Sequence, residues 1–154
     1  TVSPNESKLE ECTQRLNELI QSELDQQLDT TIPWEQFVAR MESNKHQFID
    51  LIAQVKSEGH KIAALGASTK GNVTLQTWGI TPEDILVVGD VNPDKDGSYT
   101  PGTWIPIKDE DTVIENYDAF VILPWHFKNY FINKEKFKGK KLIFPLPVPE
   151  IIVP

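Results

Sequence analysis

Four short apolar runs, separated by helix-forming segments, constrain the fold of this chain more than any other feature of its sequence. Each run is four or five residues long, and none follows the strict apolar and polar alternation of a half-exposed strand. Unalternating strands joined through helices are typical of a parallel sheet that is covered on both faces. The runs are KIAAL at 61–65, ILVVG at 85–89, AFVIL at 119–123 and KLIF at 141–144.

Helical segments are expected between these runs, and they complete the prediction of an α/β protein. The expected helices span 70–78, 109–116 and 127–137, and a short strand is expected at 104–107. With 154 residues, the chain has the length of one ordinary domain. We therefore predict a Rossmann-like, doubly wound parallel sheet that is preceded by a two-helix N-terminal segment.

The first N-terminal helix is expected over 4–28 and begins with a capping-box pattern. Ser3 and Glu6 can satisfy each other's backbone N–H groups in that pattern. The apolar residues recur at spacings of three and four, so they form one narrow stripe that needs burial against the second helix or another domain. The stripe consists of Leu9, Cys12, Leu16, Leu19 and Ile20.

The second helix is expected over 33–58, and Gly59 is expected to end it. On this basis the chain divides into an N-terminal helix and linker (1–32) and an α/β domain (33–154). The predicted inward face of the second helix consists of Phe37, Met41, Phe48, Ile49, Ile52 and Val55.

Charge and cysteine content indicate which partners and compartments suit the chain. Its 15 Lys and Arg against 23 Asp and Glu give a net charge of −8, which would repel a nucleic acid backbone. One cysteine, Cys12, makes no internal disulfide, so a reducing compartment and a cytoplasmic location are expected. No apolar run is long enough to cross a membrane. The chain starts at Thr1 instead of Met, and we expect it to be part of a longer protein.

The strongest chemical signal is GASTKGN at 66–72, directly after the first strand and at the start of a helix. Unpaired N–H groups at a helix N-terminus favour an anion, to which hydroxyl groups and a lysine add donors. We predict that this loop binds phosphate through Gly66, Ser68, Thr69, Lys70, Gly71 and Asn72. The alternative is purely structural: the two glycines permit a tight turn, Ser68 caps the helix and Lys70 lies in solvent.

The loop resembles the dinucleotide fingerprint G-x-G-x-x-G only in part. Gly66 and Gly71 match its first and third glycines, whereas Ser68 stands at the second, where backbone must approach a pyrophosphate closely. Asp90 ends the second strand at about the distance expected for an acidic residue that binds ribose hydroxyls. The pattern favours a nucleotide ligand over NAD bound in the usual pose.

Two further segments follow strands at the edge where such sheets bind ligands. The first is the turn-rich stretch DVNPDKDGSYTPGTWIPI at 90–107, and the second is LPWHF at 123–127. Trp125 can stack on a base or sugar, and His126 is a candidate general base, although no acidic partner is evident. Three scattered histidines and one cysteine give no metal-ligand spacing.

Four blocks in this order resemble the C-terminal domain of the S-adenosylmethionine-dependent sugar C-methyltransferases, which act on nucleotide-activated deoxysugars. They are KIAALGASTKGN at 61–72, GITPEDI at 79–85, DVNPDKDGSYTPGTWIPI at 90–107 and LPWHF at 123–127. The resemblance implies a cleft for a dTDP-sugar or similar nucleotide-sugar, lined by the loop at 66–72. Its sugar and nucleoside side would include Asp90, Asn92, Thr100, Gly102, Thr103 and Trp125.

The resemblance also implies that the chemistry lies outside this chain. S-adenosylmethionine, and with it zinc, would be bound by other domains of the same protein, so the chain would contain no catalytic residue, metal or cofactor of its own. The family has Asn after the Trp of its LPWN-like block, whereas this chain has His126 there, and Asn129 and Tyr130 replace an acidic pair.

Two other functions remain open from the sequence. An NAD(P)- or CoA-binding Rossmann-like domain is favoured by Gly66, Gly71 and Asp90 and opposed by Ser68. A structural module that dimerises through its N-terminal helix is favoured by the apolar stripe of that helix. The first would bind NAD, and the second would bind no nucleotide.

Overall fold

A computed structural model of the chain describes residues 12–154 and divides into two compact units, residues 1–41 and 42–154. Helix α1 (Thr13–Asp25) belongs to the first unit, and α2 (Ile32–Ser57) runs across the division. The predicted capping box at Ser3 and Glu6 lies outside the described residues. The predicted division of the chain at residues 32 and 33, where α2 begins, stays a prediction.

The described residues of the apolar stripe are not buried within this chain, so its predicted burial against another domain stays a prediction. Cys12 precedes the helix and is exposed, and α1 contains no buried residue. Leu16, Leu19 and Ile20 of the stripe are 45–57% exposed, and the neighbouring Leu24 is 47% exposed.

Helix α2 begins and ends within one residue of its predicted bounds, but only its C-terminal half is buried. Phe48, Ile52 and Val55 are in the core, and the Phe48 ring lies 5.1 Å from the Trp78 ring. Phe37 and Ile49 are exposed, and Met41 is half-buried, so the predicted inward face is wrong at these three positions. All buried residues of α2 lie in its C-terminal half, and the Asn44 amide also donates to the carbonyl of Pro147 at 2.7 Å.

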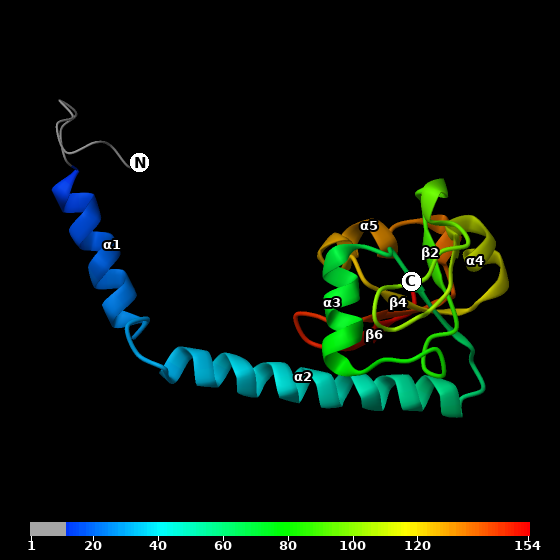
Figure 1. Cartoon of the computed structure of the whole chain (residues 1–154), viewed down its shortest axis with the longest axis horizontal. Coiled ribbons are helices and arrows are strands. Elements are labelled where there is room, and N and C mark those ends of the chain that lie inside the picture. The colour runs from blue at the N-terminus through cyan, green and yellow to red at the C-terminus, as the bar shows by residue number, and fades with distance from the viewer. Residues whose placement is uncertain (1–11) are drawn as a thin grey trace. The chain divides into compact units, whose positions relative to one another are not determined.

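Six strands form one sheet in the order β3-β2-β1-β4-β5-β6. All neighbouring pairs are parallel except β5 and β6, which are antiparallel. The fold is therefore the predicted α/β, Rossmann-like type with an N-terminal helical segment (Figure 1). The strands are β1 (Ile62–Leu65), β2 (Val88–Asp90), β3 (Ile107–Asp109), β4 (Ala119–Ile122), β5 (Lys141–Phe144) and β6 (Glu150–Ile152).

Helices cover both faces of this sheet. Helix α3 (Thr69–Trp78) lies on one face, and α4 (Glu110–Asn116) and α5 (Lys128–Ile132) lie on the other (Figure 1). On the α4 and α5 face, Val113 and Phe131 pack with Phe120 in one apolar cluster. Buried strands of this kind carry little polar surface, which is why their sequences read as unbroken apolar runs.

Several element bounds differ from the prediction. Strand β2 starts three residues late, and the N–H of Ile85 instead donates to the carbonyl of Thr81 in the preceding turn (3.1 Å). Strand β3 begins at Ile107, where the predicted strand ended. The helix predicted at 127–137 is broken: α5 ends at Ile132, since the Asn133 amide donates to the carbonyl of Asn129 (2.7 Å) and competes with the helical pattern. Strand β6 was not predicted at all.

The chain reverses direction across the sheet between β1 and β4. From β1 it proceeds outward to β2 and β3, and from β4 it proceeds the other way to β5. Loops that follow β1 and β4 therefore diverge at the carboxyl edge, and ligands of open α/β sheets bind in the crevice at this switch point. No helix among the described residues is long and apolar enough to span a bilayer.

Candidate functional site at the switch point

Two glycines bring the loop after β1 against the loop after β4. Gly66 has a positive φ of 85°, and a Cβ atom added there would lie 2.8 Å from Cδ of Pro124. A Cβ added at Gly71 would lie 2.8 Å from Cβ of Leu123. Both positions require glycine, because any side chain would separate α3 from the segment after β4.

The first turn of α3 is capped in part. Ser68 is the N-cap, and its hydroxyl accepts a hydrogen bond from the Gly71 N–H at 3.2 Å. The carbonyl of Ser68 accepts from Asn72, as in a regular helix. The N–H groups of Thr69 and Lys70 have no acceptor among the described residues, and such groups favour an anion.

Lys70 and Asn72 complete the loop on its exposed and buried sides. The Lys70 side chain is exposed, and no described residue pairs with its ammonium. The Asn72 Oδ1 atom is buried and has no donor among the described residues, a position at which a donor would be stabilising. Both features of the structural alternative, a Ser68 cap and an exposed Lys70, are present together with free N–H groups.

The carboxylate of Asp90, at the end of β2, forms hydrogen bonds with other residues of the chain, and Asp90 is only 7% exposed. Its Oδ1 accepts from the Asn92 N–H at 2.9 Å, and its Oδ2 accepts from the Lys95 ammonium at 2.9 Å. The same ammonium donates to the carbonyl of Ala67 at 3.0 Å. Lys95 therefore joins the end of β2 to the loop after β1.

The Asp90 carboxyl has a lowered pKa, although burial by itself raises it. The Lys95 ammonium and the Asn92 N–H stabilise the carboxylate and outweigh the burial. A short 3₁₀ turn, η1 (Pro93–Lys95), folds the chain back so that Lys95 reaches Asp90, and the Asn92 Oδ1 accepts from the Asp94 N–H (3.0 Å). We did not predict the role of Lys95, because the Asn92 and Pro93 pair indicates only a turn after β2.

The Thr100 to Thr103 turn is held by its own hydrogen bonds. Thr100 is fully buried, and its hydroxyl accepts from the Ile105 N–H (2.9 Å) and lies 2.6 Å from that of Thr103. The Gln76 amide on α3 donates to the carbonyl of Pro101 (2.6 Å), next to Gly102 with its positive φ of 76°. Thr100 holds the turn from inside, whereas Gly102 is exposed and Thr103 is half-buried.

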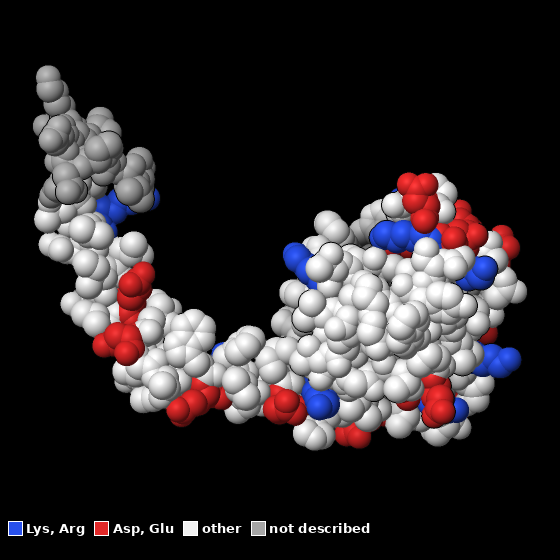
Figure 2. Space-filling view, in the orientation of Figure 1, with Lys and Arg blue, Asp and Glu red and all other residues white. Residues whose placement is uncertain are grey.

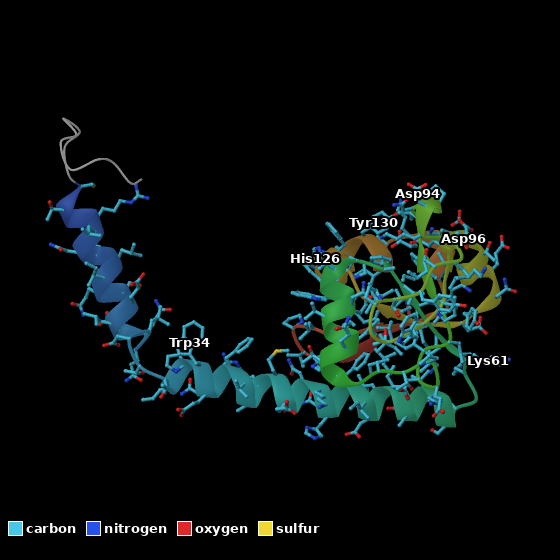
Figure 3. The ribbon with its side chains drawn as sticks, viewed as in Figure 1. Trp34, Lys61, Asp94, Asp96, His126 and Tyr130 are labelled. Atoms are coloured by element: carbon cyan, nitrogen blue, oxygen red, sulfur yellow. The ribbon has the colours of Figure 1, made fainter. Side chains whose placement is uncertain are left out.

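The segment after β4 presents aromatic rings beside the start of α3. Trp125 is half-buried and packs against the core cluster. The rings of His126 and Phe127 are exposed, with centroids 4.3 Å apart. Figure 3 shows His126 near the N-terminal end of α3, with Tyr130 on α5 close by. No described carboxylate pairs with His126, so the geometry gives it no acidic orienter.

Comparison with known proteins decides the family. The profile described as "C-methyltransferase C-terminal domain" matches residues 1–147. The chain belongs to this family. It is also 28% identical over 139 residues to the C-methyltransferase NovU of Streptomyces niveus, an alignment that covers 88% of this chain and 33% of NovU. The chain thus spans about one third of the length of this curated relative.

In this C-methyltransferase C-terminal domain, the switch point gathers some of the predicted site residues and separates others. The loop at 66–72, Asp90 and Trp125 all lie at the carboxyl edge of the sheet, whereas the Thr100 to Thr103 turn lies beside the later part of α3. The sheet domain carries few charged side chains over the face with α3, and its charges gather toward the margins (Figure 2). Acidic side chains gather at the upper margin, where Asp94 and Asp96 lie in the segment after β2 (Figure 3).

Two further observations concern other kinds of site. A hollow of about 460 Å³ lies away from the switch point, between α2 and the end of α3, and includes Ile49, Lys56 and Trp78 in its lining. Over residues 12–154, no group of three or more His, Cys, Asp or Glu is placed to hold a metal ion. The polar groups that suit an anion are at the switch point and not in the hollow.

Proposed function

We propose that this chain is the nucleotide-sugar-binding domain of an S-adenosylmethionine-dependent sugar C-methyltransferase. The observation that carries the proposal is the pair of unpaired N–H groups, those of Thr69 and Lys70, at the switch point of a C-methyltransferase C-terminal domain. A diphosphate placed there would meet two backbone donors, the positive end of the α3 dipole and the Lys70 ammonium.

The remaining parts of the ligand would lie on either side of this diphosphate position. Exposed ring faces at His126 and Phe127 suit a base or a sugar, because stacking needs an accessible ring. Trp125 supports these rings from below, since it packs on the core. The Thr100, Gly102 and Thr103 turn would form part of the outer wall, together with Asp90 and Asn92.

The methyl transfer itself is assigned to other domains of a longer protein, as the short coverage of NovU suggests. There S-adenosylmethionine would supply the methyl group, and zinc would be held in a separate region. The residues of this chain would bind and orient the sugar, a contribution that is worth several kcal/mol when geometry is fixed. Cytoplasmic biosynthesis and a dTDP-type nucleotide are part of the same proposal.

The proposal is tested by thermal unfolding of the chain with millimolar dTDP, UDP, NAD or CoA. A ligand at 100 times its Kd adds about 2.7 kcal/mol, which corresponds to a shift of about 5 to 10 °C at this size. We expect a shift with dTDP or UDP that Lys70→Ala abolishes. Lys61→Ala is the matched control, because Lys61 is also exposed but lies at the opposite end of β1 (Figure 3). A shift with NAD or CoA alone would favour a cofactor-binding domain instead.

One observation favours a second candidate function, self-association through the first helix. Leu16, Leu19, Ile20 and Leu24 of α1 are all exposed, and apolar stripes of this length usually mark an interaction surface. If the chain dimerises through α1, then replacing Leu16 and Leu19 with Glu should halve its mass in light scattering. A mass that corresponds to one chain before and after the change would remove this candidate.

A further inference from the structure

We infer that Lys95 is a specificity-determining residue: it withdraws Asp90 from ribose hydroxyls and so excludes the dinucleotide binding mode from this edge of the sheet. The inference rests on the proposed nucleotide-binding function of the loop at 66–72. It goes further by stating on which side of that loop a nucleoside can lie.

Asp90 occupies the position at which dinucleotide-binding domains keep their ribose-binding acid. That acid ends the strand next to the fingerprint strand and accepts hydrogen bonds from the ribose hydroxyls. Asp90 ends β2, and β2 lies beside β1 in parallel register. By position alone, Asp90 would therefore be available to an NAD-like ligand.

The hydrogen bonds of Asp90 within the chain make its carboxylate unavailable to an NAD-like ligand. One carboxylate oxygen accepts from the Asn92 N–H and the other from the Lys95 ammonium, both at 2.9 Å. Lys95 also donates to the Ala67 carbonyl (3.0 Å), so its ammonium lies between the end of β2 and the loop after β1. A ribose would have to displace this ammonium, leaving a carboxylate that is 7% exposed without its counter-charge.

The other side of the loop has no such obstruction among the described residues. The N–H groups of Thr69 and Lys70 stay unpaired, and His126 and Phe127 expose their rings after β4. A nucleoside diphosphate can therefore keep its phosphates at α3 while its nucleoside lies on the β4 side. Lys95 thus selects nucleoside diphosphate ligands that extend toward β4 over dinucleotides that extend toward β2.

The test measures the affinities of NAD and dTDP for the native chain, Lys95→Met and Lys61→Met by calorimetric titration. We expect NAD to bind Lys95→Met at least tenfold more tightly than the native chain, and the double variant Lys95→Met/Asp90→Asn to lose this gain. Lys61→Met removes the same charge at the far end of β1 and should leave NAD affinity unchanged. The affinity for dTDP should change less than threefold in Lys95→Met.

A second variant protects the test against a folding defect in Lys95→Met. Lys95→Gln retains a donor for the Ala67 carbonyl while removing the charge, and it should show the same gain for NAD. No gain in a folded Lys95 variant, or a gain that survives Asp90→Asn, would overturn the inference. Absence of dTDP and UDP binding to the native chain would contradict the proposed function instead, and the NAD comparison would still report on Lys95.

Discussion

Gly66 and Pro124 bring the two loops of the switch point into close contact. A Cβ atom at Gly66 would lie 2.8 Å from Cδ and 3.1 Å from Cγ of Pro124. These residues follow β1 and β4, the two central strands at which the chain changes direction. The contact sets the spacing between the start of α3 and the aromatic segment after β4, and hence the geometry of the proposed site.

Gly66→Ala should therefore destabilise the chain more than a comparable glycine substitution elsewhere. Gly79→Ala is the control, because Gly79 also has a positive φ (71° against 85°) but no atom within 4 Å of an added Cβ. Both variants incur backbone strain, whereas Gly66→Ala also overpacks a rigid proline, at a further cost of about 1 to 3 kcal/mol. Urea unfolding measures the difference; equal losses for the two variants would show that Pro124 can move aside.

Ser68 allows its capping role to be separated from its proposed role in phosphate binding. Ser68→Ala should lower stability by about 1 kcal/mol, because the Gly71 N–H loses its acceptor. Ser68→Asp keeps a good N-cap and should be within about 0.5 kcal/mol of the native stability. Its carboxylate would nonetheless repel a diphosphate at the same helix end, so dTDP affinity should fall at least tenfold. Retained dTDP affinity in Ser68→Asp would place the ligand elsewhere.

The ion pair of Asp90 and Lys95 predicts a pH-dependent loss of stability in Lys95→Met. The pKa of Asp90 lies below its ordinary value of 3.8 in the folded chain, so the ion pair contributes fully above that value and is lost as the pH falls through the folded pKa. At pH 7, the free energy of unfolding of Lys95→Met should be about 1 to 2 kcal/mol lower than that of the native chain. This loss is smaller than for a fully buried ion pair, because the Lys95 side chain is 36% exposed and solvent screens its charge.

The difference in unfolding free energy between the native chain and Lys95→Met should become smaller as the pH falls. Burial without the ammonium raises the pKa of Asp90 in the variant, so its carboxyl is protonated first and no longer needs a counter-charge. Unfolding in urea at several pH values between 7 and 4 follows this change. Lys61→Met, with no described partner for its ammonium, should show no comparable trend. A difference that stays constant or widens on acidification would mean that the ion pair does not stabilise the fold.

The sequence was sufficient for those elements whose signals are local. Strands β1, β4 and β5 and the start of α3 lie within one residue of their predicted positions. Their signals are local, because an unbroken apolar run indicates burial on both faces and Ser68 indicates a helix cap. Strand β6 was not predicted, because it is defined by pairing with β5, as between Ile151 and Ile143, and not by its own sequence pattern.

The place of the 66–72 loop in the fold could be predicted, its contacts only in part, and its role as a binding site stays a prediction. Placing GASTKGN between a strand and a helix was enough to locate the switch-point loop, because parallel strands end at one edge. The link from Lys95 to Ala67 joins residues 28 positions apart and depends on how β1 and β2 pair, so no spacing rule reveals it. The burial of the Thr100 hydroxyl was not foreseen either, although its partners Thr103 and Ile105 are only three and five residues away.

The most direct test of the central claim is a titration of the isotopically labelled chain with dTDP, followed through backbone amide signals by NMR. We predict saturable shifts at Thr69 and Lys70, and at the residues of η2 (Trp125–Phe127), because both groups would contact the ligand. Ile49 and Trp78, in the hollow beside α2, should not respond. Saturable shifts confined to that hollow, or unchanged signals at Thr69 and Lys70 up to several millimolar dTDP, would contradict the assignment of the switch-point loop.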